Sequence, residues 1–217
     1  MNYILVEYTG YLVGIAAIIG LIRIRQLDQA YYPFVLVLWF GTINEILTTI
    51  VVDRGFSNAL NSNIYVLIEA LLIVWFIYNH GVFRGRRGMV FLICSMLILS
   101  WSVEAMIFTP HKHFSSYFGA IYSFTIVILS VTLINQLLES EKKSILRHPA
   151  FIIAIGFLLF YTCNIIVEIF YLYGLEASKE KLVGRIYSII PYVNLLVNLI
   201  YIFALLWIPR KQKYTLL

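Results

Sequence analysis

The sequence predicts an all-α membrane protein with seven transmembrane helices. Of its 217 residues, 61% are hydrophobic and only 12% are charged, whereas about 25% are charged in an ordinary soluble domain. Apolar runs of about 20 residues, the length that crosses a bilayer, recur along the whole chain. Lipid offers backbone N–H and C=O groups no hydrogen-bond partner, and the runs are too long for barrel strands, so we expect each run to be a helix.

Short polar segments separate the runs and set their ends. We expect spans at about 4–23, 31–52, 61–79, 88–108, 115–138, 149–173 and 186–208. Each span ends at or just before a polar, mostly basic segment. In chain order, these segments are Arg23, Arg54-Gly55, the arginines of 84–87, the loop TPHKHF, Lys142-Lys143, the basic segment 179–185 and Arg210. No loop is long enough for a second domain, so 1–217 is expected to be a single transmembrane domain. The N-terminus lacks the basic region and cleavage site of a removable signal peptide, so the first span is expected to stay.

The basic residues predict the orientation. Eleven of the 16 Lys and Arg residues fall in the loops after the first, third and fifth spans and in the tail: Arg23, Arg25, Arg84, Arg86, Arg87, Lys142, Lys143, Arg147, Arg210, Lys211 and Lys213. Cytoplasmic loops carry such an excess, which predicts an outside N-terminus and a cytoplasmic C-terminus in a cell inner membrane. The net charge of +5 then indicates topology and contact with anionic lipid, and we expect no nucleic-acid partner.

A short internal echo suggests a repeat. The second span contains Phe-Gly-Thr-Ile-Asn at 40–44, and the sixth contains Phe-Tyr-Thr-Cys-Asn at 160–164. If the echo is real, the first three and last three spans are parallel copies joined by the fourth, a 3+1+3 layout of the kind from which carriers are built. A chance match between apolar sequences is the alternative.

Four carboxylates break the apolar pattern: Glu45, Glu69, Glu104 and Glu168. A charged side chain at the centre of a span costs about 2.5–3.5 kcal/mol, so such residues normally face the bundle interior. They come from four different spans, yet each lies roughly 6–13 Å below the outer surface at 1.5 Å per residue. This shared depth predicts one polar pocket that opens outward.

Helical spacing identifies the residues that accompany the carboxylates. Polar stripes contain Asn58, Ser62, Tyr65 and Glu69; Gly41, Asn44, Glu45 and Thr48; Tyr161, Asn164, Glu168 and Tyr171; and Tyr187, Pro191, Asn194, Asn198 and Tyr201. From these we predict a ligand-binding set of Asn44, Glu45, Tyr65, Glu69, Glu104, Asn164, Glu168, Asn194 and Asn198. The alternative is that the amides only join helices by hydrogen bonds.

Small residues mark two other spans as packing surfaces. They are Gly10 and Gly14 in the first span, and Ser116, Gly119, Ser123 and Ser130 in the fifth.

Several known chemistries do not fit. The last span has no lysine for a retinal Schiff base, and His80 and His148 lie at the opposite end from His111 and His113, so no three histidines can converge on zinc. His111 and His113 are expected to be solvated loop residues, and no phosphate-binding loop or nucleophile motif occurs. We therefore predict no metal, no cofactor and no catalytic residue. Acid–base hydrolysis by paired carboxylates stays open as an alternative.

The stretch Asn63-Ile-Tyr65-Val-Leu-Ile-Glu69, after Asn44-Glu45 and a loop containing Gly55, resembles small seven-helix membrane proteins of Bacteroidetes-type bacteria. The resemblance covers the second and third spans, implies a bacterial inner-membrane setting and supplies no activity. The 3+1+3 layout also looks like that of small sugar carriers and nicotinamide-riboside carriers. Their Pro-Gln pair and paired-Trp motif are absent here, and architecture alone assigns no function.

The leading hypothesis is a pocket that binds a small polar or cationic solute. No Lys or Arg lies in the membrane layer of the carboxylates, so protons, a bound cation or an amine-bearing ligand must neutralise them. One version is a proton-coupled carrier. The alternatives are a sensor whose basic loop 83–88 contacts a cytoplasmic protein, and an intramembrane carboxylate-dependent hydrolase.

Overall fold

The computed structural model describes residues 12–108, 114–140, 145–173 and 189–208, and this part of the chain is helical, without a β-strand. The α-helices are α2 (Leu12–Arg23), α3 (Tyr32–Asp53), α4 (Ala59–Asn79), α5 (Arg87–Val103), α6 (Ser116–Ser140), α7 (Pro149–Tyr173) and α9 (Ile190–Trp207). Short 3₁₀ turns, Gln29–Tyr31 and Ile145–Arg147, precede α3 and α7, and a π-helical turn, Glu104–Phe108, continues α5.

Six helical segments are long and apolar enough to cross a membrane, as expected of a multi-pass membrane protein. They are the second to seventh predicted spans, and their ends agree with the predicted ends within a few residues wherever these are described. Of the first predicted span, only the 12 residues of α2 are described; residues 4–11 lie outside the described part, as do 186–188 of the seventh. The outside N-terminus stays a prediction.

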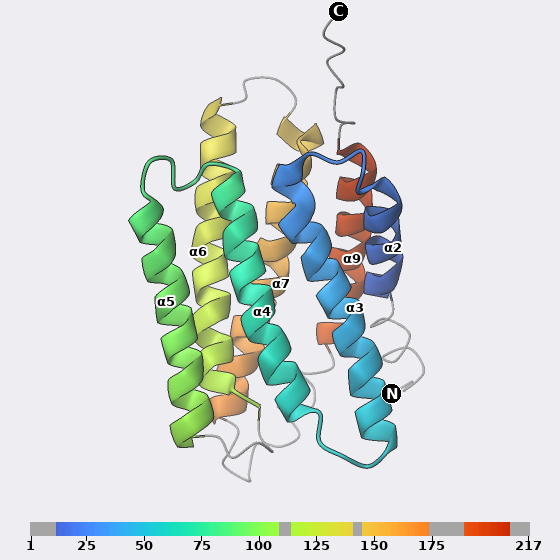
Figure 1. The fold of residues 1–217 in the computed structure, drawn as a ribbon, viewed down its shortest axis with the longest axis vertical. Helices are drawn as coiled ribbons and strands as arrows, with labels where there is room; N and C mark the ends of the chain where they lie inside the picture. Colours follow the sequence, from blue (N-terminus) through green and yellow to red (C-terminus); the bar gives the residue numbers. More distant parts are fainter. Residues whose placement is uncertain (1–11, 109–113, 141–144, 174–188, 209–217) are drawn as a thin grey trace, which may run out of the picture.

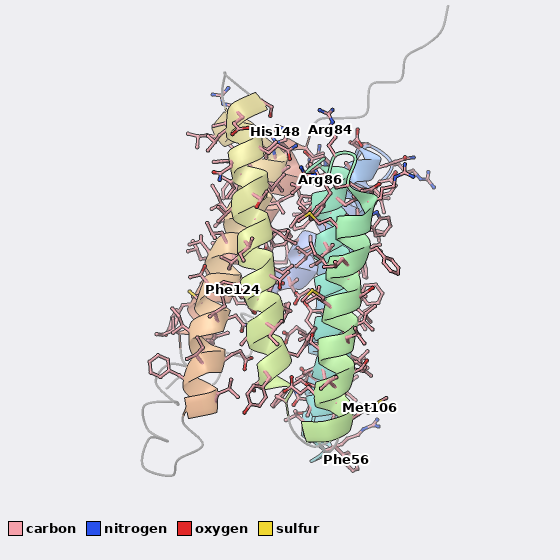
Figure 2. The ribbon with its side chains drawn as sticks, turned by 90° about the vertical axis from the view of Figure 1, so that its left-hand side faces the viewer. Phe56, Arg84, Arg86, Met106, Phe124 and His148 are labelled. Carbon is pink, nitrogen blue, oxygen red and sulfur yellow. The ribbon has the colours of Figure 1, made fainter. Side chains whose placement is uncertain are left out.

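Six of the described helices form a closed ring (Figure 1). Going round it, α2 packs on α3, α3 on α4, α4 on α6, α6 on α7, α7 on α9, and α9 on α2 again. The remaining described helix, α5, lies outside this ring against α4 and α6, on the face seen in Figure 2. Its only buried residue is Leu97, and large apolar side chains such as Phe91 and Met96 are exposed on it. Such a surface suits lipid.

A hydrogen-bonded contact ties the first described helix to the last. The guanidinium of Arg23, at the end of α2, donates to the carbonyl oxygens of Leu205 and Ile208, the latter at 2.9 Å. Carbonyls at a helix C-terminus have no partner within the helix and carry partial negative charge, so a cation there is stabilising. Arg23 thereby closes the ring between α2 and α9.

The interior of the ring is filled by aromatic rings near the end where α4 is followed by the turn into α5. Phe34 lies 5.1 Å from Tyr201 and 6.0 Å from Phe157, between ring centroids, and Phe76 lies 5.8 Å from Phe157. Edge-to-face pairs at these distances are favourable beyond the area that they bury. This aromatic cluster packs the interior of the ring in that half of the bundle.

The predicted packing surface of the fifth span is confirmed. Ser116, Gly119, Ser123 and Ser130 are all buried on α6, the helix that packs on α7. In the first span, a Cβ built on Gly14 would lie 3.5 Å from the methyl group of Thr42, so Gly14 faces α3 at contact distance. Gly10 lies outside the described residues.

Candidate functional site

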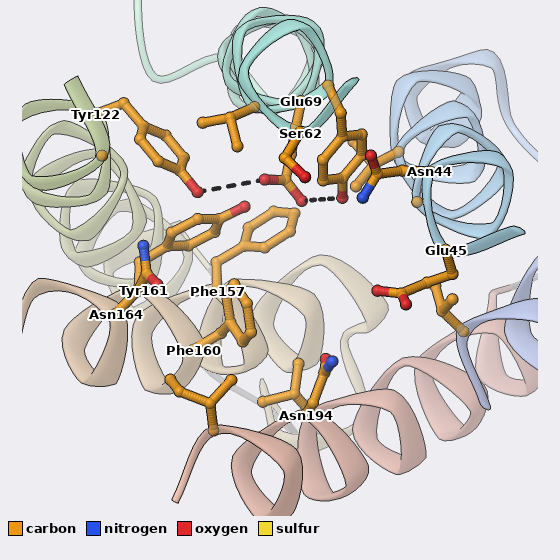
Figure 3. Close-up of a pocket in the computed structure, with 18 of the residues that line it drawn as sticks. Asn44, Glu45, Ser62, Glu69, Tyr122, Phe157, Phe160, Tyr161, Asn164 and Asn194 are labelled. Carbon is orange, nitrogen blue, oxygen red and sulfur yellow. Dashed lines mark hydrogen bonds between the residues drawn. The ribbon is translucent and has the colours of Figure 1, made fainter. Parts of the chain in front are cut away.

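A cavity of about 400 Å³ lies inside the ring, in the half opposite the aromatic cluster (Figure 3). It reaches from Ser115 and Ile190, at the end where α3 turns into α4, down to Phe157 and Tyr201. Eight of the nine residues of the predicted binding set line it: Asn44, Glu45, Tyr65, Glu69, Asn164, Glu168, Asn194 and Asn198. The ninth, Glu104, is not among the lining residues.

Glu69 is held by tyrosines from three helices. The Tyr65 hydroxyl, one turn earlier on α4, donates to Oε1 at 2.5 Å, and the Tyr122 hydroxyl of α6 donates to Oε2 at 3.4 Å. Tyr161 of α7 adds a third hydroxyl directed at the same carboxyl group. Because Glu69 is only 7% exposed, these hydroxyls replace the water that an acid of this kind would otherwise bind.

Close packing fixes the tyrosines. A Cβ on Gly41 of α3 would lie 3.3 Å from the Tyr65 hydroxyl oxygen, so the absent side chain gives that hydroxyl its place beside α3. The ring of Tyr122 stacks on Phe118, with centroids 5.5 Å apart, and meets the edge of Tyr161 at 5.4 Å. The hydroxyl groups around Glu69 are thus positioned by buried rings.

Two further carboxylates approach the same cavity from other helices. Glu45 of α3 points into it across from Asn194. Glu168 of α7 lies against Gly119 of α6, where a Cβ would come within 3.0 Å of the carboxyl carbon. Among the described residues, Oε2 of Glu168 is a buried oxygen without a hydrogen-bond partner. A buried acceptor of this kind costs free energy unless a proton or a ligand satisfies it.

The amide side chains have two kinds of role. Asn164 donates to the Ser123 hydroxyl at 2.9 Å, and Asn44 accepts from Asn61 at 2.7 Å, so both join neighbouring helices. Asn198 donates to Asn194 at 3.4 Å within α9. The alternative role in helix association therefore applies to Asn44 and Asn164, although both also line the cavity.

Glu104 caps the N-terminus of α6. Its carboxylate accepts hydrogen bonds from the backbone N–H groups of Tyr117, at 3.1 Å, and Phe118. These are among the first N–H groups of the helix, which have no partner within it, and a negative charge there is favoured by the helix dipole. The structure thus gives Glu104 a capping position at the start of α6, beside the cavity but not in its lining.

Replacement of Glu104 by alanine should lower the free energy of unfolding by about 1 kcal/mol, the usual cost of losing an N-terminal cap, and leave ligand binding by the cavity unchanged. Thermal unfolding in detergent measures the first effect. Glu139→Ala, an exposed acid in the last turn of α6, is the matched control. Loss of ligand binding with an unchanged unfolding temperature would instead show that Glu104 belongs to the binding site.

Sequence reasoning missed several tyrosines of the site. Tyr161 and Tyr201 lay on the polar stripes but were not included in the predicted set, and Tyr122 was on no stripe. The available signal was helical spacing: Tyr122 lies three residues after Gly119 on α6, so its side chain shares the buried face of that glycine.

The described lining contains no Lys, Arg or His side chain. Within the described ranges, no group of three or more His, Cys, Asp or Glu residues is placed to hold a metal ion. His111 and His113 lie outside those ranges.

Comparison with known proteins gives no match: neither a family model, nor a curated protein, nor a solved structure is similar to the chain.

Proposed function

We propose that the chain is a multi-pass membrane protein that binds a small organic cation in this cavity and carries it across the membrane. The observation that supports it is the charge of the site. Glu45, Glu69 and Glu168 line one cavity of about 400 Å³, and no described lining residue is positively charged. Carboxylates inside a membrane bundle are costly and normally serve a pathway or a ligand.

The rings around the carboxylates favour an organic cation over a bare metal ion. Tyr65, Tyr122, Tyr161, Phe157 and Phe160 all line the cavity. The face of an aromatic ring attracts an ammonium group, most strongly where water is excluded. A metal ion would need several oxygen ligands at short distance, whereas two of the Glu69 contacts are tyrosine hydroxyls. The cavity volume lies in the range of sites that bury small molecules.

Proton exchange gives the carrier version its driving force. A carboxylate that has taken up a proton no longer attracts a cation, so solute and proton compete for the same groups. We therefore expect affinity for the cation to fall as the pH is lowered. Isothermal titration calorimetry over a pH series would measure this, and an affinity independent of pH would exclude exchange at these carboxylates.

The ring order supports a carrier built from two three-helix units. A two-fold axis along the membrane normal would exchange α2, α3 and α4 with α6, α7 and α9, and the observed neighbours round the ring are those that it requires. Carriers of this construction bind solute between their repeats. In such a carrier the aromatic cluster around Phe34 and Phe157 must separate for release on the other side.

The test is binding followed by flux. Purified protein is titrated with tetramethylammonium, with primary amines of increasing size, and with neutral compounds of the same shape. Compounds that bind are then tested for counterflow in proteoliposomes at several pH values. We expect cations to bind and neutral analogues not to bind. Binding without flux would favour the sensor alternative, conversion of a lipid or solute would favour the hydrolase, and equal binding of neutral analogues would contradict the proposal.

A further inference from the structure

A second cavity, of about 630 Å³, lies on the outside of the ring between α5 and α6. It is formed by the turn between α4 and α5, the first turns of α5, and α6 from Thr125 to Gln136. It shares no residue with the cavity around Glu69. We call it the lateral groove.

The walls of the lateral groove are apolar. Met89 and Ile93 of α5 face Ile128 of α6 across it, and Met89 and Ile128 are each 49% exposed. The hydroxyls of Thr125 and Thr132, which also line it, donate to the carbonyls of Ile121 and Ile128 at 2.9 and 2.8 Å. With those hydroxyls already bonded to the backbone, the threonines offer the groove mainly their methyl groups.

The mouth of the lateral groove is basic. Arg84 and Arg86 line it and are exposed, and no acidic side chain is among its described lining residues. Both arginines lie at the end of the bundle opposite Phe56 and Met106 (Figure 2). Gln136 of α6 donates to the carbonyl of His80 at 3.2 Å, which ties the start of this turn to α6. Gly81 allows the chain to reverse there with φ of +86°.

The length of the lateral groove matches one leaflet. From Thr125 to Gln136, α6 rises roughly 16 Å at 1.5 Å per residue, about half of a hydrocarbon core roughly 30 Å thick. The walls belong to segments apolar enough to cross a membrane, Arg87–Met106 and Ser116–Ser140. A soluble protein could reach the arginines but not these walls, whereas a lipid reaches both.

From this combination we infer that the lateral groove binds one anionic phospholipid, with its phosphate at Arg84 and Arg86 and an acyl chain between α5 and α6. Basic pockets beside membrane helices attract anionic headgroups in this way. Since α5 has Leu97 as its only buried residue, a bound lipid would fill the space between α5 and the ring and hold that helix in place.

Native mass spectrometry of the purified full chain with dioctanoyl phosphatidylglycerol, and with the matching phosphatidylcholine, tests this inference. We expect retained phosphatidylglycerol adducts and a higher unfolding temperature with that lipid only. The double variant Arg84→Gln/Arg86→Gln should retain at least roughly tenfold less phosphatidylglycerol, because each arginine near an anionic headgroup adds to the electrostatic attraction that holds it. Thr132→Trp, which fills the groove at an exposed position, should also remove the adduct.

Two matched controls make the test specific. Arg25→Gln/Arg147→Gln removes two exposed charges from the same end of the bundle, and Val131→Trp adds the same bulk beside Thr132 but outside the lining. Both should retain the lipid as the unaltered protein does. Equal retention of phosphatidylcholine, or equal loss in both arginine pairs, would overturn the inference. The inference would also be overturned if the Arg84/Arg86 variant retained the lipid unchanged but no longer bound a cytoplasmic protein that binds the unaltered chain.

Discussion

Replacing Glu69 by glutamine is expected to weaken binding of the organic cation roughly 30-fold or more. Hydrogen bonds and contacts to a charged partner contribute about 1.5–3 kcal/mol, and each 1.4 kcal/mol is a factor of ten in affinity. The amide oxygen of the introduced glutamine can still accept from Tyr65, the hydroxyl that lies 2.5 Å from the carboxylate, so the local packing should survive. Calorimetric titration of the cation measures the change in affinity.

A matched control separates this effect from a general loss of charge. Glu139→Gln makes the same chemical change at an exposed position of α6 and should leave affinity unaltered. Thermal unfolding of both variants shows whether the fold is intact. If Glu69→Gln binds the cation as tightly as the original protein does, the carboxylate is not the cation's partner and the proposed function fails at its central residue.

The second large effect is on stability, at the contact between α7 and α9. A Cβ on Gly156 would lie only 2.4 Å from a ring carbon of Tyr201, and that ring is wedged against Phe34 and Phe157. Gly156→Ala must therefore push rigid aromatic groups apart, and overpacking of this kind costs about 1–3 kcal/mol. For a chain of this size, we expect the unfolding temperature to fall by roughly 4–8 °C for about 2 kcal/mol.

Gly88→Ala is the control for that experiment. Gly88 is also helical, in α5, but nothing lies within 4 Å of a Cβ built there. Since alanine is the better helix former, this variant should be as stable as the original protein or slightly more so. Equal unfolding temperatures for Gly156→Ala and the original protein would show that α9 moves away from α7 without cost.

The convergence of Glu45, Glu69 and Glu168 could be predicted from the sequence because a membrane leaves a carboxylate few positions of low energy. A carboxylate facing lipid is costly, so its depth and its helical stripe place it in the interior. The same reasoning included Glu104, which has the same depth. Its role follows from the neighbouring N-terminus of α6, because Glu104 accepts hydrogen bonds from the N–H groups there. Which helix end lies beside which depends on tertiary packing, and the sequence pattern does not predict it.

The position of α5 outside the ring was not predictable for a related reason. In a bilayer, an apolar side chain is accommodated by lipid as well as by protein, so hydrophobicity does not distinguish a central helix from a peripheral one. Tyr122 was missed because small residues marked α6 as a packing surface. The structure shows that this surface both packs on α7 and contributes to the site: Gly119 packs against Glu168, while Tyr122 contacts Glu69.

The closure of the ring by α2 and α9 has a consequence for biogenesis. A chain is synthesised from its N-terminus, so the helix that bears Glu69 enters the membrane before α6 and α7, which supply Tyr122 and Tyr161. The contact of Arg23 with Leu205 and Ile208 forms last, because it needs the final described helix. Until α9 is in place, the carboxylates of the growing chain lie in an incomplete ring, so the ribosome must finish α9 before the cavity is enclosed.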